Sequence, residues 1–156
     1  MPYRATIGRM PHNWPTAVES ELVRAGWRRG RRVDTTGFRR ALASESLRLH
    51  SPARTFLAEY GGLTLDIRGP GVTCARTPVR FDPGLCDGEG ERFLEWSDQV
   101  GRAIVPIGDL DLGRWFLGID DNGVVYLVET RLATFGVTHE AVARLVEGHA
   151  PDDVEL

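Results

Sequence analysis

The chain contains no lysine, and all nineteen of its basic residues are arginine. A bias this complete indicates a GC-rich genome more readily than nineteen separate requirements for a guanidinium group. Arginine clusters in this sequence therefore carry less functional meaning than they would elsewhere, where basic runs point to nucleic acid.

Cysteine is scarce, and long apolar runs are absent. Cys74 and Cys86 have neither a Cys-x-x-Cys spacing nor neighbouring histidines, which indicates reduced structural thiols rather than a disulfide or a metal site. The longest apolar runs, such as residues 103–107, are too short to cross a bilayer. Residues 1–10 lack the apolar core of a signal peptide. We therefore expect a cytoplasmic protein with no membrane partner.

Catalytic and cofactor-binding patterns are missing as well. Neither Ser44 nor Ser46 lies in a Gly-x-Ser-x-Gly elbow, and the glycine-rich residues 69–71 and 84–90 lack phosphate-binding signatures. The histidines have no metal-binding spacing, so we interpret them as surface or capping residues. They are His12, His50, His139 and His149. We therefore predict no enzymatic activity, no catalytic residues, no cofactor and no metal.

A hydrophobic content of 42% and four tryptophans indicate a globular core in this chain of 156 residues. The length suits a single domain over residues 1–156, with residues 1–15 and 150–156 at its periphery. Residues 1–54 hold eleven arginines and four acids, whereas residues 55–156 hold eight arginines and eighteen acids. The molecule should therefore have a basic, helical start and an acidic remainder.

Three helices should precede the first strand. Thr16 and Glu19 form a capping box that opens the first helix, which ends at Gly26. A second, short helix follows residues 34–36. The inward residues of these two helices are Val18, Leu22 and Val23 in the first, and Phe38, Ala41 and Leu42 in the second.

The run from Ser51 onward predicts a third helix, its end and a strand. Ser51 suits the N-cap and Pro52 suits the first helical position. Gly61 then provides the left-handed residue that ends the helix, and at least one residue of the pair Gly61 and Gly62 should have a positive φ. A strand follows, because apolar residues alternate at Leu63, Leu65 and Ile67.

The strongest local signal is Asp121-Asn122-Gly123, a turn that joins predicted strands over residues 114–120 and 124–129. A two-residue turn would place Ile119 opposite Tyr126. A three-residue turn with a bulge at Gly123 would place Gly118 there instead. The sequence leaves both registers open.

Other elements flank this hairpin. Pro106 demotes the strand over residues 104–107 to an edge or a bulge. Residues 91–100 should form a helix, Thr138 should start the last helix, and residues 151–156 should fray. The fold class is thus α+β: a mixed, mainly antiparallel sheet with helices packed on one face. The inward residues predicted for the helix over 91–100 are Phe93, Leu94, Trp96 and Val100.

Four acidic residues near the predicted turns could act together: Asp109, Asp111, Asp120 and Asp121. Their simplest role is to solubilise the turns. They could also form an acidic rim for a basic partner, or bind calcium or magnesium, although the spacing of an EF-hand is absent.

Arginines 28, 29, 31 and 32 follow Trp27 and could form a nucleic-acid patch with an aromatic platform. However, Trp27 directly follows the glycine that ends a helix, which favours a core position. The net acidity also disfavours general affinity for nucleic acid. We therefore interpret these arginines as a solvated face.

The passage FLAEYGGLTL, residues 56–65, resembles the signature of the SUKH superfamily, which includes fungal cell-wall synthesis regulators and many bacterial immunity proteins. Further segments occur in an order similar to that of the third SUKH immunity group, so the resemblance covers roughly the whole chain. These segments are residues 21–42, 80–84, 100–127 and 135–148. Two departures are Phe38, where the family more often has tryptophan, and the loosely matched residues 69–77.

The resemblance implies an immunity protein that binds a cognate bacterial polymorphic toxin and neutralises it by direct protein–protein inhibition. Nucleases and nucleic-acid deaminases are the implied toxins, and an acidic inhibitor would suit their basic grooves. One alternative is a regulatory protein-binding scaffold of the fungal type. Another is a nucleic-acid-binding domain.

We expect the partner surface at the central hairpin, because its second face need not be covered by helices. Aromatic anchors with charged rims are the usual anatomy of tight interfaces. Trp115 is equally compatible with the core. The predicted partner-binding residues are Asp109, Asp111, Trp115, Asp120, Asp121 and Glu129.

Overall fold

The computed structural model describes residues 12–156, which form five α-helices, one short 3-10 helix and a seven-stranded sheet. The helices are α2 (Thr16–Ala25), α3 (Thr36–Ala43), α4 (Ser51–Tyr60), η1 (Pro83–Cys86), α5 (Gly90–Val100) and α6 (Thr138–Glu147). The strands are β1 (Thr64–Leu65), β2 (Val79–Arg80), β3 (Val105–Leu110), β4 (Trp115–Ile119), β5 (Val124–Val128), β6 (Leu132–Val137) and β7 (Asp152–Asp153).

The strands lie side by side in chain order, and each described pair is antiparallel. Short connections between antiparallel neighbours explain this order, because each strand can return directly beside the previous one. The predicted α+β class is confirmed, and the sheet expected to be mixed is antiparallel throughout the described strands.

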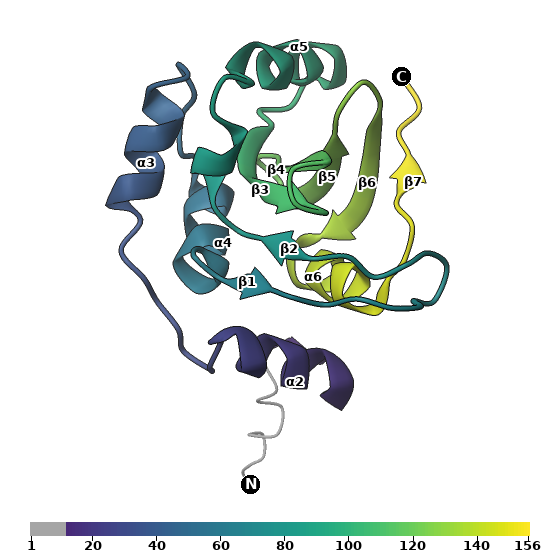
Figure 1. Cartoon of the computed structure of the whole chain (residues 1–156). Coiled ribbons are helices and arrows are strands. Elements are labelled where there is room, and N and C mark those ends of the chain that lie inside the picture. Colours follow the sequence, from purple (N-terminus) through teal and green to yellow (C-terminus); the bar gives the residue numbers. More distant parts are fainter. Residues whose placement is uncertain (1–11) are drawn as a thin grey trace, which may run out of the picture.

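Helices cover both faces of the central strands. Successive residues of β4 point to opposite faces. A Cβ at Gly118 would lie 2.9 Å from Phe93 Cε2, so α5 packs on this face. Leu117 and Ile119 point to the other face and are fully buried, and Figure 1 shows α4 and α6 on that side. Helices were predicted on one face of the sheet. The structure has α4 and α6 on that face and, in addition, α5 on the opposite face.

The start of α2 differs from the prediction, whereas its end agrees. Pro15 is the N-cap and makes no side-chain hydrogen bond, so Thr16 is already helical and the predicted capping box does not form. Val18 is buried but Val23 is 53% exposed, because Val23 lies outside the inward stripe of the helix. Gly26 ends the helix in the left-handed conformation, with φ 114°.

The boundaries of α4 are set by His50 and by two glycines with different roles. His50 is the N-cap and its Nδ1 accepts a hydrogen bond from the Ala53 N–H (3.2 Å), so Ser51 is the first helical residue. Gly61 has φ −57°, and the positive φ belongs to Gly62, at 86°. A Cβ at Gly61 would lie 2.4 Å from Leu57 O, so this position needs glycine for close approach.

The β4–β5 hairpin has the register of the three-residue turn. Gly118 lies opposite Tyr126, and Ile119 lies opposite Val125. Gly123 has φ 85° and its N–H donates to Asp120 O (3.0 Å), which closes the turn. This register places the side chains of Asp120 and Tyr126 on the same face of the sheet.

β3 is an interior strand although it contains proline. The predicted edge position is wrong, whereas the predicted bulge is confirmed by a shift in register between Pro106 and Gly108. β2 pairs with β3 only at Asp109 and Leu110. The proline therefore lies beyond the stretch where β2 requires backbone donors from β3.

The described ends of the chain both contact the rest of the fold. Trp14 is buried before α2. The predicted frayed tail is wrong, because β7 pairs with β6 and the Val154 N–H donates to Leu132 O (3.2 Å). The predicted ends include residues 1–11, which lie outside the described residues.

The core prediction is largely confirmed. In α5, Phe93 is buried against the sheet, but Leu94 is 44% exposed and was wrongly placed inward. Trp96 is partly buried, and the other predicted core residues are buried: Trp27, Phe56, Leu57, Leu63, Leu117, Ile119 and Tyr126.

Within residues 12–156, no helix combines the length and the apolar character that a membrane span requires.

Candidate functional site

The six residues predicted to bind a partner lie at two ends of the sheet. Asp120 and Asp121 occupy the β4–β5 turn at one end. The end of β3, the start of β4 and the end of β5 meet at the other. Located there are Asp109, Asp111, Trp115 and Glu129. The structure therefore does not gather the six residues into one cluster.

Asp109 is buried and paired within the sheet. Its carboxylate accepts hydrogen bonds from Arg80 Nε (2.9 Å) and Arg80 Nη2 (2.5 Å), across the β2–β3 pair. The same hydrogen bonds raise the pKa of Arg80. Because Asp109 is only 1% exposed, it joins β2 to β3 and offers no direct contact to a partner. This corrects its predicted place on the surface.

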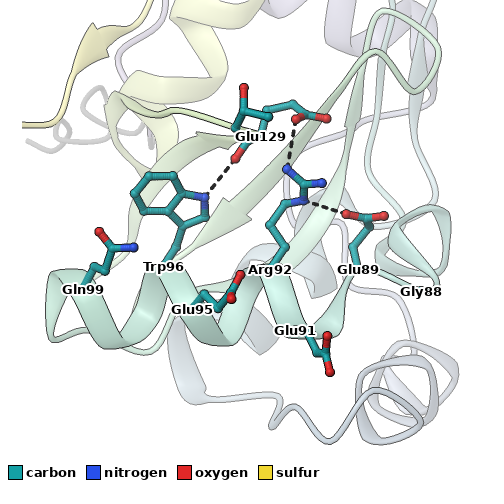
Figure 2. Close-up of a pocket in the computed structure, with 9 residues that line it drawn as sticks. Gly88, Glu89, Glu91, Arg92, Glu95, Trp96, Gln99 and Glu129 are labelled. Carbon is teal, nitrogen blue, oxygen red and sulfur yellow. Dashed lines mark hydrogen bonds and ion pairs between the residues drawn. The ribbon is translucent and has the colours of Figure 1, made fainter.

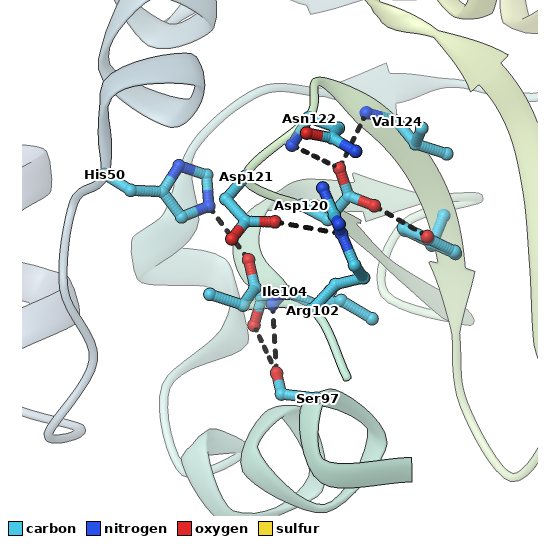
Figure 3. A network of polar contacts seen from close by, with 10 residues as sticks. His50, Ser97, Arg102, Ile104, Asp120, Asp121, Asn122 and Val124 are labelled. Carbon is cyan, nitrogen blue, oxygen red and sulfur yellow. Dashed lines mark hydrogen bonds and ion pairs between the residues drawn. The ribbon is translucent and has the colours of Figure 1, made fainter. Parts of the chain in front are cut away.

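Asp120 is also buried, at 2% exposed. Its Oδ1 accepts from the N–H groups of Asn122 (2.8 Å) and Val124 (3.0 Å), and its Oδ2 accepts from the Tyr126 hydroxyl (2.7 Å). Figure 3 shows these contacts converging on the carboxylate. Burial and the bond to Asp120 raise the pKa of Tyr126. Asp120 therefore shapes the hairpin turn, and its predicted surface position is likewise corrected.

Asp121, the next residue, is accessible. Its side chain is 46% exposed, and Oδ1 lies 3.1 Å from Nε of Arg102, just after the end of α5 (Figure 3). A partly exposed ion pair of this kind contributes little to stability. The Asp121 carboxylate is therefore free to exchange Arg102 for a partner cation.

Asp111 and Trp115 are partly exposed at the β3–β4 turn. Arg114 accompanies both: its guanidinium carbon lies 5.1 Å from the centre of the Trp115 ring, and its Nη1 lies 3.9 Å from Asp111 Oδ2. Trp115 also packs against the core. The two residues can contact a partner, but Arg114 reduces the local negative charge.

Glu129 lines a surface hollow of about 420 Å³ beside α5, shown in Figure 2. Its Oε1 accepts from Arg92 Nη1 (3.0 Å), and its backbone oxygen accepts from Trp96 Nε1 (2.9 Å). Arg92 Nε also donates to Glu89 Oε1 (2.7 Å), and this bond raises the pKa of Arg92. The indole and the guanidinium of α5 thus anchor the β5–β6 turn.

Two further glutamates of α5 line the hollow and have no ion pair within the described chain. Glu91 and Glu95 are exposed and lie one helical turn apart, and Asp98 continues the same outward stripe. Glu129 lies beside Arg92 and Trp96 of this helix, and Asp121 lies beside Arg102, just after its end. We name the set the α5 acidic surface: Glu89, Glu91, Glu95, Asp98, Asp121 and Glu129.

Sequence reasoning missed most of this surface. The spacing of Glu91, Glu95 and Asp98 was a usable signal, because residues at i, i+4 and i+7 of a helix share a face. The prediction considered only the inward face of this helix. The approach of Glu129 and Asp121 to α5 depends on how the helix crosses the sheet, for which the sequence holds no local signal.

The arginine-rich loop between α2 and α3 is mostly solvated, as predicted. Arg28, Arg29 and Arg32 are exposed, whereas Arg31 donates to the backbone oxygens of Glu59 (2.5 Å) and Gly61 (2.9 Å). Trp27 is buried, so its ring is not an open platform for bases.

Two histidines belong to an internal cluster, contrary to the prediction of surface or capping roles. The rings of His12 and His139 stack, with centres 3.5 Å apart. His12 Nε2 lies 2.6 Å from Glu59 Oε2, and the Tyr60 hydroxyl lies 2.6 Å from His139 Nδ1. Burial and the nearby His12 lower the pKa of His139, while Glu59 opposes this effect. His50 does have the predicted capping role.

Cys86 is buried, and its Sγ donates a hydrogen bond to Gly108 O (3.2 Å). Burial raises the pKa of this thiol, so it stays protonated at neutral pH. Because a protonated, inaccessible thiol is a poor nucleophile, Cys86 has a structural role.

Comparison with known proteins identifies the family. A family model described as SUKH-3 immunity protein matches residues 14–148. No curated protein and no solved structure gives a significant match. The matched range contains every helix from α2 to α6 and the whole α5 acidic surface. The chain therefore belongs to the SUKH-3 immunity protein family.

Proposed function

We propose that this protein binds a cognate bacterial toxin and neutralises it by direct protein–protein inhibition, without chemistry of its own. The observation that carries the proposal is membership of the SUKH-3 immunity protein family over residues 14–148. An immunity protein needs a surface complementary to its toxin. We assign that role to the α5 acidic surface.

Charge and shape support this assignment. The α5 acidic surface contains six carboxylates, and two arginines, Arg92 and Arg102, form ion pairs with it. Leu94, on the outward side of the helix, is 44% exposed and provides an apolar contact among the acids. An apolar contact inside a charged rim resembles the anatomy of specific protein interfaces. We propose Asp111 and Trp115, which lie at the same end of the sheet as Glu129, as further contact residues.

The partner of such a surface should be basic. Toxins that act on nucleic acid carry positive grooves that contact phosphates, and an acidic inhibitor would be attracted to such a groove and compete with the substrate. A nuclease or a nucleic-acid deaminase is therefore the class of toxin that we propose, with neutralisation taking place in the cytoplasm.

The first experiment is to co-express the protein with the toxin domain encoded by the neighbouring gene and to measure survival and complex formation. We expect rescue of growth and a stable complex. Failure to bind any neighbouring toxin, together with stable capture of an endogenous regulatory protein, would favour the scaffold role instead.

The second experiment tests the surface by charge reversal. Glu91→Arg with Glu95→Arg should slow association with that toxin by roughly tenfold or more at low salt, because steering acts mainly on the association rate. A matched control is Asp66→Arg with Glu140→Arg, whose side chains are 74% and 62% exposed elsewhere on the molecule. Equal association rates for the two double variants would move the binding surface away from α5.

Asp121→Arg is the corresponding single variant at the β4–β5 turn. Asp120 is unsuitable for charge reversal, because its carboxylate is buried and satisfies three donors. A loss of binding in an Asp120 variant would report a damaged fold and would say nothing about the interface.

A further inference from the structure

We propose that His12, Glu59 and His139 form a binding site for a divalent transition-metal ion such as Zn²⁺. The residues come from the segment before α2, from α4 and from α6, and their ligand atoms all lie within 4.8 Å of one another. Two imidazoles and one carboxylate form a ligand set that zinc accepts, with a fourth position left for water. This site is on the side of the sheet opposite α5, so it is independent of the proposed toxin surface.

The spacing of the ligand atoms is close to that of a coordination shell. Zinc binds nitrogen and oxygen at about 2.0–2.2 Å, so two ligands of one tetrahedral ion lie roughly 3.4 Å apart. His12 Nε2 and Glu59 Oε2 are already in contact at 2.6 Å. Side-chain shifts on the order of 1 Å would bring the three groups to that separation, with the ion between His12 and Glu59 in place of their hydrogen bond.

Buried neighbours orient two of the three ligands. The Tyr60 hydroxyl contacts His139 Nδ1 (2.6 Å), which fixes the orientation of the ring. Trp27 Nε1 donates to Glu59 Oε2 (2.9 Å). Tyr60 and Trp27 are both buried. Outer partners of this kind are typical of metal sites, because they hold ligands in place and tune their basicity.

His12 is the ligand whose hydrogen bonding is incomplete. Its Nδ1 is buried and has no partner among the described residues, which is unusual for a polar atom inside a protein. Its ring stacks on that of His139, whereas imidazoles that share an ion direct their nitrogens at it. Metal binding should therefore tilt His12 away from His139. The Trp14 ring, centred 4.6 Å from that of His12, would report the movement.

The consequence is a metal clamp between distant parts of the chain. Trp14 Nε1 donates to His139 O (3.0 Å), so the segment before α2 already rests on the start of α6. An ion held by His12, Glu59 and His139 would add a bond from this segment to α4 and to α6. Because the ion would bind the folded chain, zinc should raise the melting temperature.

The test is titration of the full chain with Zn²⁺ alone, followed by calorimetry and by tryptophan fluorescence. We expect one equivalent to bind, with a change in fluorescence and a higher melting temperature that a chelator reverses. His12→Gln, Glu59→Gln and Tyr60→Phe should each weaken affinity tenfold or more, the last by loss of an outer partner. Circular dichroism without zinc identifies any variant that fails to fold. Of these variants, His12→Gln changes the ligand nearest the start of the described chain, where the side chain is partly exposed.

Cys74→Ser with His149→Ala is the matched control. Cys74 is exposed and its backbone N–H donates to Gly148 O, beside His149, so these two side chains could bind zinc adventitiously. The control should retain full affinity. Absence of saturable binding in the native chain would overturn the proposal, and so would loss of binding in the control with retention in folded His12→Gln.

Discussion

Asp120 and Asp121 are neighbours in the sequence, but their carboxylates have different surroundings. Asp120 is 2% exposed and accepts three hydrogen bonds, whereas the side chain of Asp121 is 46% exposed and pairs with Arg102. The β-strand period explains the contrast, because consecutive residues at a strand end point in opposite directions.

Replacing each aspartate by alanine should separate these roles. Asp120→Ala leaves the N–H groups of Asn122 and Val124 and the Tyr126 hydroxyl without an acceptor, so we expect a loss of about 2 kcal/mol or more in the free energy of unfolding. Asp121→Ala should change it by about 0.5 kcal/mol or less. Urea denaturation measures both. Similar losses for the two variants would contradict the assignment.

Gly61 and Gly62 form a second pair with unlike requirements. Gly62→Ala should cost on the order of 1 kcal/mol, because its φ of 86° is unfavourable for a residue with a Cβ, although the space around it is open. Gly61→Ala should cost more, since its Cβ would lie 2.4 Å from Leu57 O and 2.5 Å from Phe38 Cε2. Thermal melts of the two variants give the order. The reverse order would show that the backbone strain at Gly62 costs more than the steric clash at Gly61.

At the scale of elements, the start of a helix can be capped by a side chain that is far away in the sequence. Glu45, which follows α3, accepts hydrogen bonds from the N–H groups of Gly88 (3.1 Å) and Gly90 (2.8 Å) at the start of α5. First-turn N–H groups have no partner within their own helix. Glu45 therefore fixes the start of α5, the helix that carries the α5 acidic surface, relative to α3.

This contact predicts a pH dependence. The hydrogen bonds from Gly88 and Gly90 lower the pKa of Glu45 in the folded state, so its contribution is present above the ordinary carboxyl pKa and is lost as the pH falls below it. Glu45→Gln should be less stable than the native chain at pH 7, and this difference should shrink as the pH falls through the lowered pKa of Glu45. Denaturant titrations from pH 7 to pH 3 measure this, with Glu140→Gln as an exposed control. Parallel curves for native and Glu45→Gln proteins would contradict the prediction.

At the scale of the whole molecule, one core joins the helices to the sheet. Phe56 of α4 is 1% exposed, and its ring centre lies 4.7 Å from that of Tyr60 and 5.2 Å from that of Phe81 beside β2. Tyr60 in turn contacts His139 at the start of α6. The aromatic contacts therefore connect the middle of the chain to its last helix.

Phe56→Ala should lower the free energy of unfolding by about 3–5 kcal/mol, because a large cavity would remain between elements that cannot easily collapse. Val72→Ala, at a side chain that is 62% exposed, should change it by about 0.5 kcal/mol or less. Denaturant unfolding of both proteins provides the comparison. A small effect of Phe56→Ala would show that the core lies elsewhere.

Local patterns determined much of this protein. The end of α2 at Gly26, the burial of Phe56 and Leu57, and the pairing of β4 with β5 each depend on residues close together in the chain. Capping, helical periodicity and turn chemistry act over a few residues, so the sequence alone indicates them. The resemblance to the SUKH superfamily likewise came from the order of such segments.

Tertiary structure decided which charged and titratable groups are accessible and which groups meet. The burial of Asp109 depends on the alignment of β2 with β3, and the α5 acidic surface depends on how α5 crosses the sheet. His12, Glu59 and His139 come together only because three distant segments pack on one another. Such contacts form between elements, and the free energy that selects them comes from packing the whole core, which no local pattern encodes.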